Sequence, residues 1–496
     1  MRLHLILLGI LLLPLFTALK AQQTNLTLAQ QIEDFEIFVG GLKEGHSGLN
    51  YFIDQKILSV KCDSIRKSFE ENASIESYYL KLRYIATLLC HGHTRINLPT
   101  NGWVNYKMGV LDSTKIYLPF EFLIINKQLF IKEDCSKEQL FPKYSEVKSI
   151  DNINVATLIN SMLQFIPADG VNQTFKYYNL YNYFYFHYLY DLFYPGKKAY
   201  KIELKNNYTH YYIQGLKASS IDSIYRKKNN QGISTYGKQL DYTCNVSKNT
   251  GYLKIGSFYK GLIENFGQKY EPFLDSAFAD IKSKNVQNLI IDLRNNEGGG
   301  DGYDNILIRY LIGKISISKD IQVPGRVFKY NEYAINLTDD VKGFIENPTE
   351  FLRDDSTLFI KEKYVNMMTE GVIEPPKYRF NGNIIVLTNG GSFSATTNVI
   401  STLYNFRKNS TRKILFVGEE QGGDIYCGTE CAGQGYTIKL PNSSIQIDMP
   451  FLCFGVLKKE YPKKRVPDFL IYDKIRDLKQ NKDTVLAFAI NLCEGK

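Results

Sequence analysis

Ser394 occupies the point of the sequence that is most suggestive of chemistry. It lies in the segment NIIVLTNGGSFSATTNVISTLYNF, where an apolar run ends in two glycines and apolar residues then recur at helical spacing. This pattern predicts a buried strand, a tight turn and a helix. A serine held at such a bend exposes its hydroxyl beside the unpaired amides and the positive end of the helix dipole, which favours acyl transfer. Serine is also a common helix cap, so this segment alone leaves both interpretations open.

A second glycine-rich turn follows another apolar strand. The segment NLIIDLRNNEGGGDG carries three consecutive glycines directly after that strand. Glycines let backbone amides approach a ligand closely, and amides that donate to a developing oxyanion contribute about 3 kcal/mol each. A phosphate-binding loop is a competing interpretation, but the GK[ST] ending and the GxGxxG spacing are both missing. A plain flexible turn is the third interpretation.

The elements that must position these turns alternate along the second half of the chain. From residue 251 to about 491, strands such as GYLKIGSF and KILFVGE alternate with helices such as FLDSAFADIKSKN. This alternation predicts a mainly parallel sheet covered by helices. Upstream, residues 27–89 have helical spacing and residues 103–213 have short alternating runs that indicate strands. Residues 175–196 are crowded with Tyr and Phe, which predicts a core or a domain seam, with a substrate-lining surface as the alternative.

The start of the chain indicates export. The residues MRLHLILLGILLLPLFTALKAQQ have the charge, short apolar run and small residue of a secretory signal peptide, with an uncleaved anchor as the alternative. No later apolar run is long enough to span a membrane, so we expect an exported protein, periplasmic or extracellular, without a span after cleavage. The net charge of +9 is modest for 496 residues and its Lys and Arg are scattered, so nucleic-acid binding is not expected.

The cysteines do not suggest a metal centre. The eight cysteines are irregularly spaced, and Cys427 and Cys431 are the one close pair. They could form a loop disulfide, whereas zinc would need two more ligands and no histidine follows His210. We therefore expect no metal and no cofactor.

The two glycine-rich segments together resemble a known peptidase family. LIIDLRNNEGGG and VLTNGGSFSATT, with VGE at residues 417–419, are similar to the signature segments of C-terminal-processing, or tail-specific, proteases and the related tricorn core proteases. The resemblance implies an α/β fold with a ClpP/crotonase-like spiral β-β-α core, preceded by a helical cap and a PDZ-like α+β domain. On this basis we expect a signal peptide (1–21), a helical N-terminal cap (22–99), a PDZ-like domain with the aromatic-rich segment (100–215), a linker (216–250) and a serine peptidase core (251–496).

The resemblance also implies which residues form the site. The family's nucleophile maps to Ser394, and Ser392 is the less favoured candidate. The oxyanion donors map to the backbone amides of Ala395 and of the Gly298-Gly299 turn.

The base is where this chain departs from the tail-specific pattern. Those proteases place a lysine shortly after VGE, but here the sequence reads GEEQGGDIYCG and the next lysine is Lys439. The tricorn-like branch uses an upstream histidine instead, and CHGHTRINLP resembles its DGHT pattern. His93 is therefore the expected base, with His91 in the place where Asp is usual. An imidazole of pKa about 6.5 suits proton abstraction near neutral pH.

These residues predict an exported serine endopeptidase acting on peptide or protein substrates. Ser394 would attack the scissile carbonyl, and His93 would take its proton and return it to the leaving amine. A carboxylate normally orients such a base; Glu419 is the tentative choice, and Glu420 and Glu460 stay open. The main alternative is a catalytically inactive peptide- or lipid-binding protein on the same scaffold, because the resemblance extends to interphotoreceptor retinoid-binding proteins. A crotonase-like acyl-CoA enzyme is a third reading, although an exported chain would rarely meet CoA.

Overall fold

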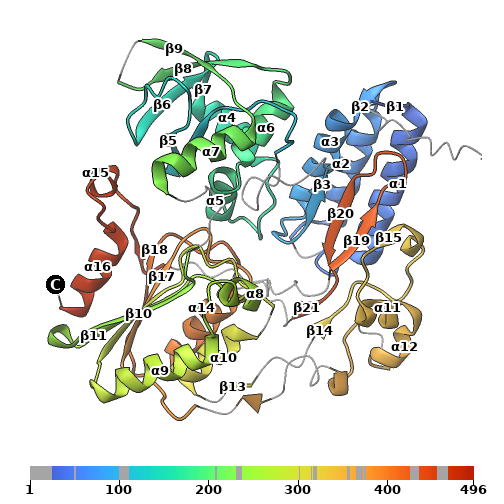
Figure 1. The fold of residues 1–496 in the computed structure, drawn as a ribbon. Helices are drawn as coiled ribbons and strands as arrows, with labels where there is room; N and C mark the ends of the chain where they lie inside the picture. The colour runs from blue at the N-terminus through green and yellow to red at the C-terminus, as the bar shows by residue number, and fades with distance from the viewer. Residues whose placement is uncertain are drawn as a thin grey trace, which may run out of the picture.

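The computed structural model describes residues 25–495 apart from 50–51, 100–110, 207–208, 231–236, 301, 314, 317–320, 355–357, 365–371, 374–375, 425–434 and 455–466. The expected signal peptide therefore lies outside the described residues. Three bodies are visible in Figure 1: a helical unit from the start of the chain, an α+β unit, and a larger unit built on a parallel sheet. In this described part, no helix has both the length and the apolar character needed to cross a membrane.

The first body contains three helices, and their starts follow from local capping. Thr27 and Gln30 form a reciprocal capping box at the first helix, while the side chains of Asp54 and Ser74 accept amide hydrogen bonds at the next two. The elements are β1 (Asn25–Leu26), α1 (Leu28–Gly45), α2 (Gln55–Lys67), β2 (Ala73–Ser74) and α3 (Ile75–Leu88). Strands β1 and β2 pair antiparallel.

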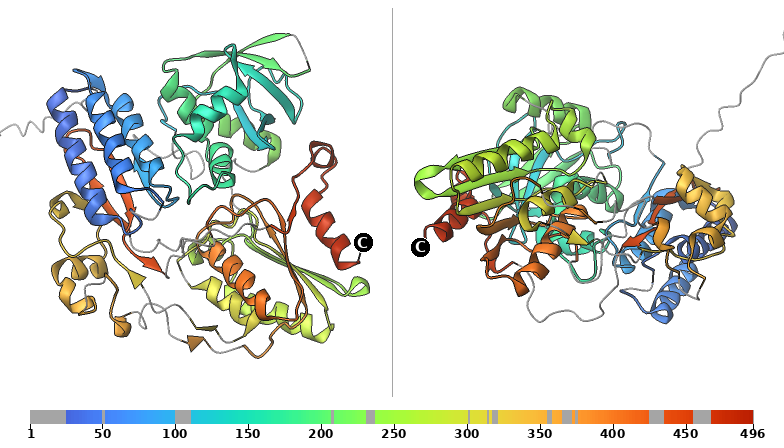
Figure 2. Two further views of the ribbon diagram at one scale, coloured as in Figure 1. Left: turned by 180° about the vertical axis from the view of Figure 1, so that it is seen from behind. Right: turned by 90° about the horizontal axis from the view of Figure 1, so that it is seen from below.

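Strands from the far end of the chain complete this helical body. A four-stranded antiparallel sheet has the order β15-β19-β20-β3, so a strand near residue 96 pairs with one near residue 447. Asp34 of α1 also accepts hydrogen bonds from the amides of Asn442 and Ser443. Figure 2 shows β19 and β20 lying against α1. The sheet and its neighbours are β3 (Arg95–Asn97), β14 (Ile321–Gln322), β15 (Ala334–Ile335), α11 (Asp339–Glu346), α12 (Pro348–Phe351), β19 (Gly435–Lys439), β20 (Gln446–Pro450) and β21 (Cys453–Phe454).

This arrangement differs from the expected single core over residues 251–496. Apolar residues of the stretches around 321–364 and 435–452 share one buried cluster with the helices of the first body. The physical reason is the alternation in β19 and β20, whose buried residues face α1 and α3 rather than the parallel sheet.

The second body is an antiparallel sheet with helices. Its strand order is β4-β5-β6-β8-β9, with β7 beside β6. Asp151 and Asn152 both have positive φ, 50° and 64°, in the tight turn between β6 and β7. The elements are β4 (Phe120–Ile125), β5 (Gln128–Asp134), β6 (Ser145–Ile150), β7 (Ile153–Asn154), α4 (Val155–Leu163), α5 (Thr174–Asn182), α6 (Tyr185–Phe193), β8 (Ala199–Leu204) and β9 (His210–Gln214).

The segment expected as a linker is partly ordered structure. Helix α7 (Ala218–Asn229) buries Ala218, Ile221 and Tyr225 against the second body, and β10 (Leu240–Asn245) joins the parallel sheet. The expected linker over residues 216–250 therefore contains a helix and a strand of the sheet. Helix α7 ends with three exposed basic residues. Because of them, the sequence of this amphipathic helix is polar enough to resemble that of a linker.

The third body holds the predicted parallel sheet. Its order is β10-β11-β12-β17-β18-β22, and every pair except β10·β11 is parallel. Successive residues of β17 point to opposite faces of the sheet. Ile384 and Val386 pack with α9, α10 and α14 on one face, while Ile385 and Leu387 pack with α16 on the other. The elements are η1 (Val246–Lys248), β11 (Thr250–Ile255), α8 (Lys260–Glu264), α9 (Tyr270–Ser283), β12 (Asn288–Asp292), α10 (Tyr303–Ile312), β13 (Ile315–Ser316), β16 (Val372–Ile373), β17 (Asn383–Thr388), α14 (Ala395–Phe406), η3 (Arg407–Asn409), β18 (Ile414–Gly418), β22 (Phe469–Leu470), α15 (Ile475–Leu478) and α16 (Thr484–Cys493). The short helix η2 (Asn331–Tyr333) lies beside β19 of the first body.

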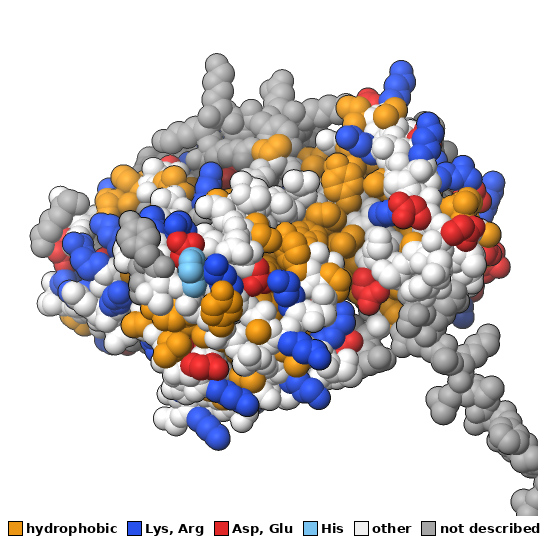
Figure 3. Space-filling view, turned by 90° about the horizontal axis from the view of Figure 1, so that it is seen from above, with side chains coloured by type: hydrophobic (Ala, Val, Ile, Leu, Met, Phe, Trp, Pro, Cys, Tyr) orange, Lys and Arg blue, Asp and Glu red, His pale blue; other side chains and the backbone are white. Residues whose placement is uncertain are grey.

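The register of this sheet brings the two glycine-rich turns together. Asp292 at the end of β12 lies opposite Leu387 near the end of β17, and the two strands run parallel. The segments that follow them leave the same edge of the sheet side by side. On the upper face drawn in Figure 3, Lys and Arg are interspersed with Asp and Glu around a central gathering of hydrophobic side chains, without a basic stripe.

Candidate active site

Ser394 sits at a strained position between β17 and α14. It is the N-cap residue of α14, with φ 56° and ψ −125°, and its side chain makes no capping hydrogen bond. A positive φ in a residue with a Cβ costs about 1–3 kcal/mol and marks positions held for a purpose. The amide of Ala395, which begins the helix, donates no hydrogen bond to any residue that the structure describes. The serine hydroxyl thus lies at the start of a helix with an unengaged amide next to it.

Ser392 has a structural role instead. Its side chain is fully buried. Its hydroxyl donates to the carbonyl oxygen of Leu293 over 2.8 Å and accepts from the amide of Asn389 over 3.1 Å. A hydroxyl engaged on both sides inside the protein is not available to attack a substrate, so the geometry separates the two candidate nucleophiles in favour of Ser394.

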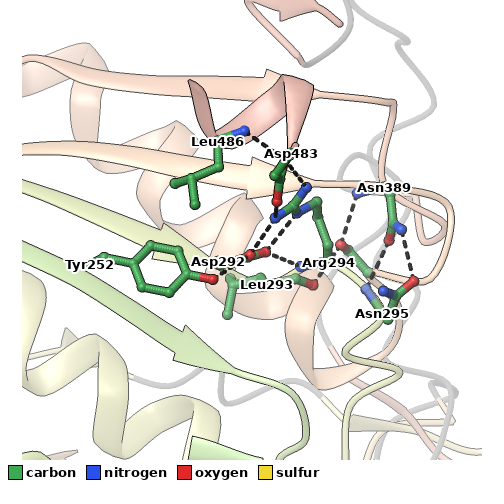
Figure 4. A network of polar contacts seen from close by, with 9 residues as sticks. Tyr252, Asp292, Leu293, Arg294, Asn295, Asn389, Asp483 and Leu486 are labelled. Atoms are coloured by element: carbon green, nitrogen blue, oxygen red, sulfur yellow. Dashed lines mark hydrogen bonds and ion pairs between the residues drawn. The ribbon is translucent and has the colours of Figure 1, made fainter. Parts of the chain in front are cut away.

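Side-chain amides fasten the two glycine-rich turns to each other (Figure 4). The backbone amide of Asn295 donates to Asn389 Oδ1 over 2.9 Å, and the side-chain nitrogen Nδ2 of Asn389 donates to Asn295 Oδ1 over 2.8 Å. Just before them, the Arg294 guanidinium bridges Asp292 and Asp483, each through two hydrogen bonds. Bidentate pairs of this kind fix geometry as well as adding energy. The turn that carries Ser394 is therefore rigidly placed against the turn that carries the glycines.

Gly298 makes the closest approach to the serine. Its φ is 95°, and a Cβ at this position would lie 2.8 Å from both the Ala395 amide nitrogen and Ser394 Cβ. Its own amide already donates to Asn296 Oδ1 over 2.9 Å. The Gly299 amide, by contrast, donates to no residue in the described part of the chain. Of the three expected oxyanion donors, Ala395 and Gly299 carry unengaged amides, whereas Gly298 supplies the space that lets the two turns meet.

His93 reaches this turn from the first body. Its half-buried imidazole stacks on the Phe393 ring, with centroids 4.5 Å apart and planes at 29°. Phe175 of the second body stacks on the same phenyl ring at 4.1 Å, so Phe393 lies between the two. The structure thus places an imidazole from the first hundred residues against the neighbour of Ser394.

Two further histidines pack behind His93. His46 caps the end of α1, accepts from the amide of Gly48 through Nδ1 and donates from Nε2 to Thr94 Oγ1 over 2.6 Å. The His91 ring meets it edge-on at 5.2 Å. Burial lowers the pKa of His91 to about 4, and burial together with His91 and Arg95 lowers the pKa of His93 well below its usual value. All of these imidazoles are therefore neutral near pH 7.

Asp169 is the acid that the sequence argument missed. Its fully buried carboxyl group accepts from the Gly92 amide over 2.7 Å, directly beside His93. Burial, with a smaller effect from Asp424, raises its pKa to about 8. In sequence, the residue sits in the stretch Ala-Asp-Gly after a helix, which is ordinary turn chemistry and gives no sign of a site.

Glu419 lies elsewhere. It follows β18, where burial and then Asp473 raise its pKa to about 7, and it neighbours Tyr181. Among the residues that the structure describes, no hydrogen bond or ion pair joins Glu419 to His93. Its assignment as the third member was based on its position as the last residue of VGE; in the structure its carbonyl oxygen accepts a hydrogen bond from Thr388 Oγ1 over 2.7 Å. Glu460 lies outside the described residues.

The part of the chain that carries both glycine-rich turns is similar to a known protein family. Residues 249–431, which include both glycine-rich turns, match the description "Peptidase family S41". The chain thus carries a domain similar to peptidase family S41, in agreement with its resemblance to the C-terminal-processing proteases. It is accordingly a serine-type peptidase. No curated protein sequence matches the chain.

Solved structures agree at the level of the fold. The crystal structure of the CPAF s499a mutant has a TM-score of 0.61 at 12% identity, covering 91% of this chain and 94% of that one. Mature CPAF complexed with lactacystin has a TM-score of 0.60 at 12% identity, covering 94% and 97%. The mixed α/β fold of this S41 peptidase is therefore shared over nearly its whole length.

The aromatic-rich segment of this S41 peptidase forms a seam over the site. Tyr178 donates to Glu297 Oε1 over 2.7 Å, and Tyr183 also hydrogen-bonds to Glu297, next to the glycine run. Asn172 Nδ2 donates to the carbonyl oxygen of Gln421 over 2.8 Å. The prediction of a core or seam over residues 175–196 is confirmed, because Tyr178 and Tyr183 contact the glycine-rich turn and Phe175 stacks on Phe393 of the serine turn.

Proposed function

We propose that this S41 peptidase cleaves peptide bonds through an acyl-enzyme on Ser394, with His93 as the general base. The observation that carries the proposal is the imidazole stacked on Phe393, the residue before a strained serine at a helix start. Ser394 Oγ attacks the scissile carbonyl as His93 takes its proton, and His93 then protonates the leaving amine. Water, deprotonated by the same imidazole, releases the acyl group.

The amides of Ala395 and Gly299 hold the oxyanion in this scheme. Both are unengaged in the described structure, and they belong to the two turns that Gly298 allows to meet. Backbone donors fixed in advance stabilise charge as it develops, by about 3–4 kcal/mol for each donor.

Ring stacking positions the base. A buried carboxylate usually holds the catalytic imidazole, but the pKa of Asp169 is raised to about 8, so this acid is neutral at pH 7. The orientation of His93 instead follows from its stacking on Phe393 and from its backbone amide, which donates to His91 Nδ1 over 3.4 Å.

The finer architecture and the location belong to the same proposal. The strand–turn–strand–helix of β6, β7 and α4 supports a PDZ-like recognition unit for peptide substrates. The parallel sheet with its helices supports a ClpP/crotonase-type core. The apolar N-terminal segment supports export, and Cys453 is disulfide-bonded, which suits an oxidising compartment.

A second candidate function is a catalytically inactive binding protein on this scaffold. The observation in its favour is that His93 has a neutral imidazole and a neutral acid beside it, rather than an anionic partner.

The test is labelling of the full-length mature chain with a serine-directed fluorophosphonate. We expect labelling of the wild type and of Ser392→Ala, none of Ser394→Ala, and slowing of at least about 100-fold in His93→Ala. His210→Ala, which alters an exposed histidine of β9, is the matched control. Equal labelling of the wild type and Ser394→Ala would exclude the proposed nucleophile. No labelling of any variant, with retained peptide binding, would favour the binding protein.

A further inference from the structure

Three potential metal ligands converge beside the proposed base. His91 and His93 come from the connection between α3 and β3, and Asp169 comes from the connection between α4 and α5. One ligand atom from each residue lies within 4.8 Å of the other two. His91 is 1% exposed and Asp169 is 0% exposed, while His93 is half-buried and forms the open side of the cluster.

Each of these side chains has a buried polar atom without a hydrogen-bond partner among the described residues. His91 Nδ1 accepts from the His93 amide, and Asp169 Oδ1 accepts from the Gly92 amide. In the described structure His91 Nε2, His93 Nδ1 and Asp169 Oδ2 are buried without a hydrogen-bond partner. The backbone of Asp424 also approaches the Asp169 carboxyl group. An unsatisfied buried polar atom costs about 1–3 kcal/mol, so three in one place call for a shared partner.

We propose that His91, His93 and Asp169 form a binding site for a zinc-like divalent cation, and that the bound cation switches the peptidase off. Two imidazoles and a carboxylate are a ligand set that zinc accepts, leaving a fourth position for water. Binding displaces the proton of Asp169 into solvent and moves the proton of His91 from Nε2 to Nδ1, which gives up its 3.4 Å hydrogen bond from the His93 amide. Neighbouring ligand atoms around tetrahedral zinc are about 3.3 Å apart, from Zn–N and Zn–O bonds of about 2.0–2.1 Å. The cluster therefore needs to contract by about 1.5 Å at most, which side-chain rotation can supply.

The inhibition follows from the chemistry of the imidazole and rests on the proposed role of His93. A neutral imidazole has one nitrogen with a lone pair and one with a proton. If the cation takes Nδ1, the buried unsatisfied nitrogen, Nε2 must carry the proton. Nε2 can then donate but cannot accept the proton of Ser394. Binding thus fixes the base in the wrong tautomer without needing to block the substrate.

The sequence argument against a metal considered Cys427 and Cys431. The histidine pair His-Gly-His was assigned to catalysis alone, and Asp169 is 76 positions beyond His93 in sequence, so the third ligand could not be recognised. The expectation of no metal is replaced here by this proposal.

Binding is tested without any need for activity. Full-length mature Ser394→Ala protein, stripped with EDTA, is titrated with zinc chloride by calorimetry. We expect one zinc per chain. In the same background, His91→Ala and Asp169→Asn should each weaken binding at least tenfold, and His210→Ala should leave it unchanged. Asp169→Asn keeps the acceptor for the Gly92 amide, so it remains informative if His91→Ala fails to fold. Absence of binding to the Ser394→Ala protein, or binding by the His91→Ala and Asp169→Asn variants as tight as by that protein, would overturn the site.

Inhibition is tested separately on protein with an intact serine. Zinc should slow fluorophosphonate labelling of the wild type at least tenfold, and EDTA should restore it. Asp169→Asn should lose this zinc sensitivity, whatever its rate without metal. Labelling that zinc leaves unchanged or accelerates would overturn the switch. If metal-free wild type does not label at Ser394, the proposed catalytic function fails, while the calorimetric result for the site still stands.

Discussion

Replacing Gly298 with alanine should disable the site while leaving the chain folded. The new Cβ would lie 2.8 Å from the Ala395 amide nitrogen, 2.8 Å from Ser394 Cβ and 3.0 Å from the Phe393 carbonyl oxygen. Two of these three atoms belong to the backbone, so no flexible side chain can yield to all of them. The φ of 95° adds a conformational penalty that only glycine avoids.

The magnitude follows from two contributions. A left-handed conformation costs an alanine about 1–2 kcal/mol, and forced overpacking adds about 1–3 kcal/mol, so the free energy of unfolding should fall by about 2–5 kcal/mol. The overlap also pushes the Ala395 amide away from its place at the oxyanion. Loss of one such donor lowers the rate about 10²–10³-fold.

The assay combines urea unfolding with the rate of fluorophosphonate labelling. Gly300→Ala is the matched control, since a Cβ there meets nothing within 4 Å and the residue lies two positions along the same run. Its labelling rate should remain within about twofold of wild type, because substitutions at open surface positions change little. If folded Gly298→Ala labels as fast as Gly300→Ala, the close approach of the two turns plays no part in catalysis.

Three other perturbations test separate parts of the site. Ser392→Ala should lower the free energy of unfolding by about 1–3 kcal/mol in urea titrations, because it removes the acceptor of the Asn389 amide and one of the two donors to the Leu293 carbonyl. The variant should still label, and loss of labelling in folded protein would contradict the structural role of Ser392. Asp483→Ala should cost about 1–3 kcal/mol in the same assay, since it removes the cap of α16 and a partner of Arg294; an unchanged midpoint would refute this. In zinc-free buffer, the midpoint of the acid limb of kcat/KM against pH should lie below pH 6.5. The lowered pKa keeps His93 neutral in more acidic solution, and the neutral imidazole can accept a proton. A midpoint above pH 7 would argue against this base.

The sequence predicted the parts of this protein that depend on local pattern. The apolar strands over residues 288–292 and 383–388 and the helix behind Ser394 all lie where their periodicity placed them. Because the strands are parallel neighbours, the meeting of their two turns also followed from pattern. The backbone strain at Ser394 agrees with the predicted strand-to-helix bend.

Long-range pairing set the limit of prediction. Asp169 and Glu419 illustrate it: each is an acid near a turn, and only the packing of three bodies decides which one reaches the histidines. The same holds for β3 and β20, whose pairing across some 350 residues has no signature in either strand. Helix α7 was missed for a different reason, since its exposed basic residues hid a narrow apolar stripe.

The pairing of β3 with β20 determines when the active site of this peptidase can be assembled. His93 lies two residues ahead of β3, and β3 lacks its neighbour until residues 446–448 exist. Contacts this distant in sequence form late, after a large loop-closure cost has been met. A chain that is still being synthesised therefore carries its serine turn before the strand that follows His93 has its partner. The order of strand pairing therefore delays assembly of the active site until synthesis of the chain is nearly complete. No removable propeptide is required for that delay.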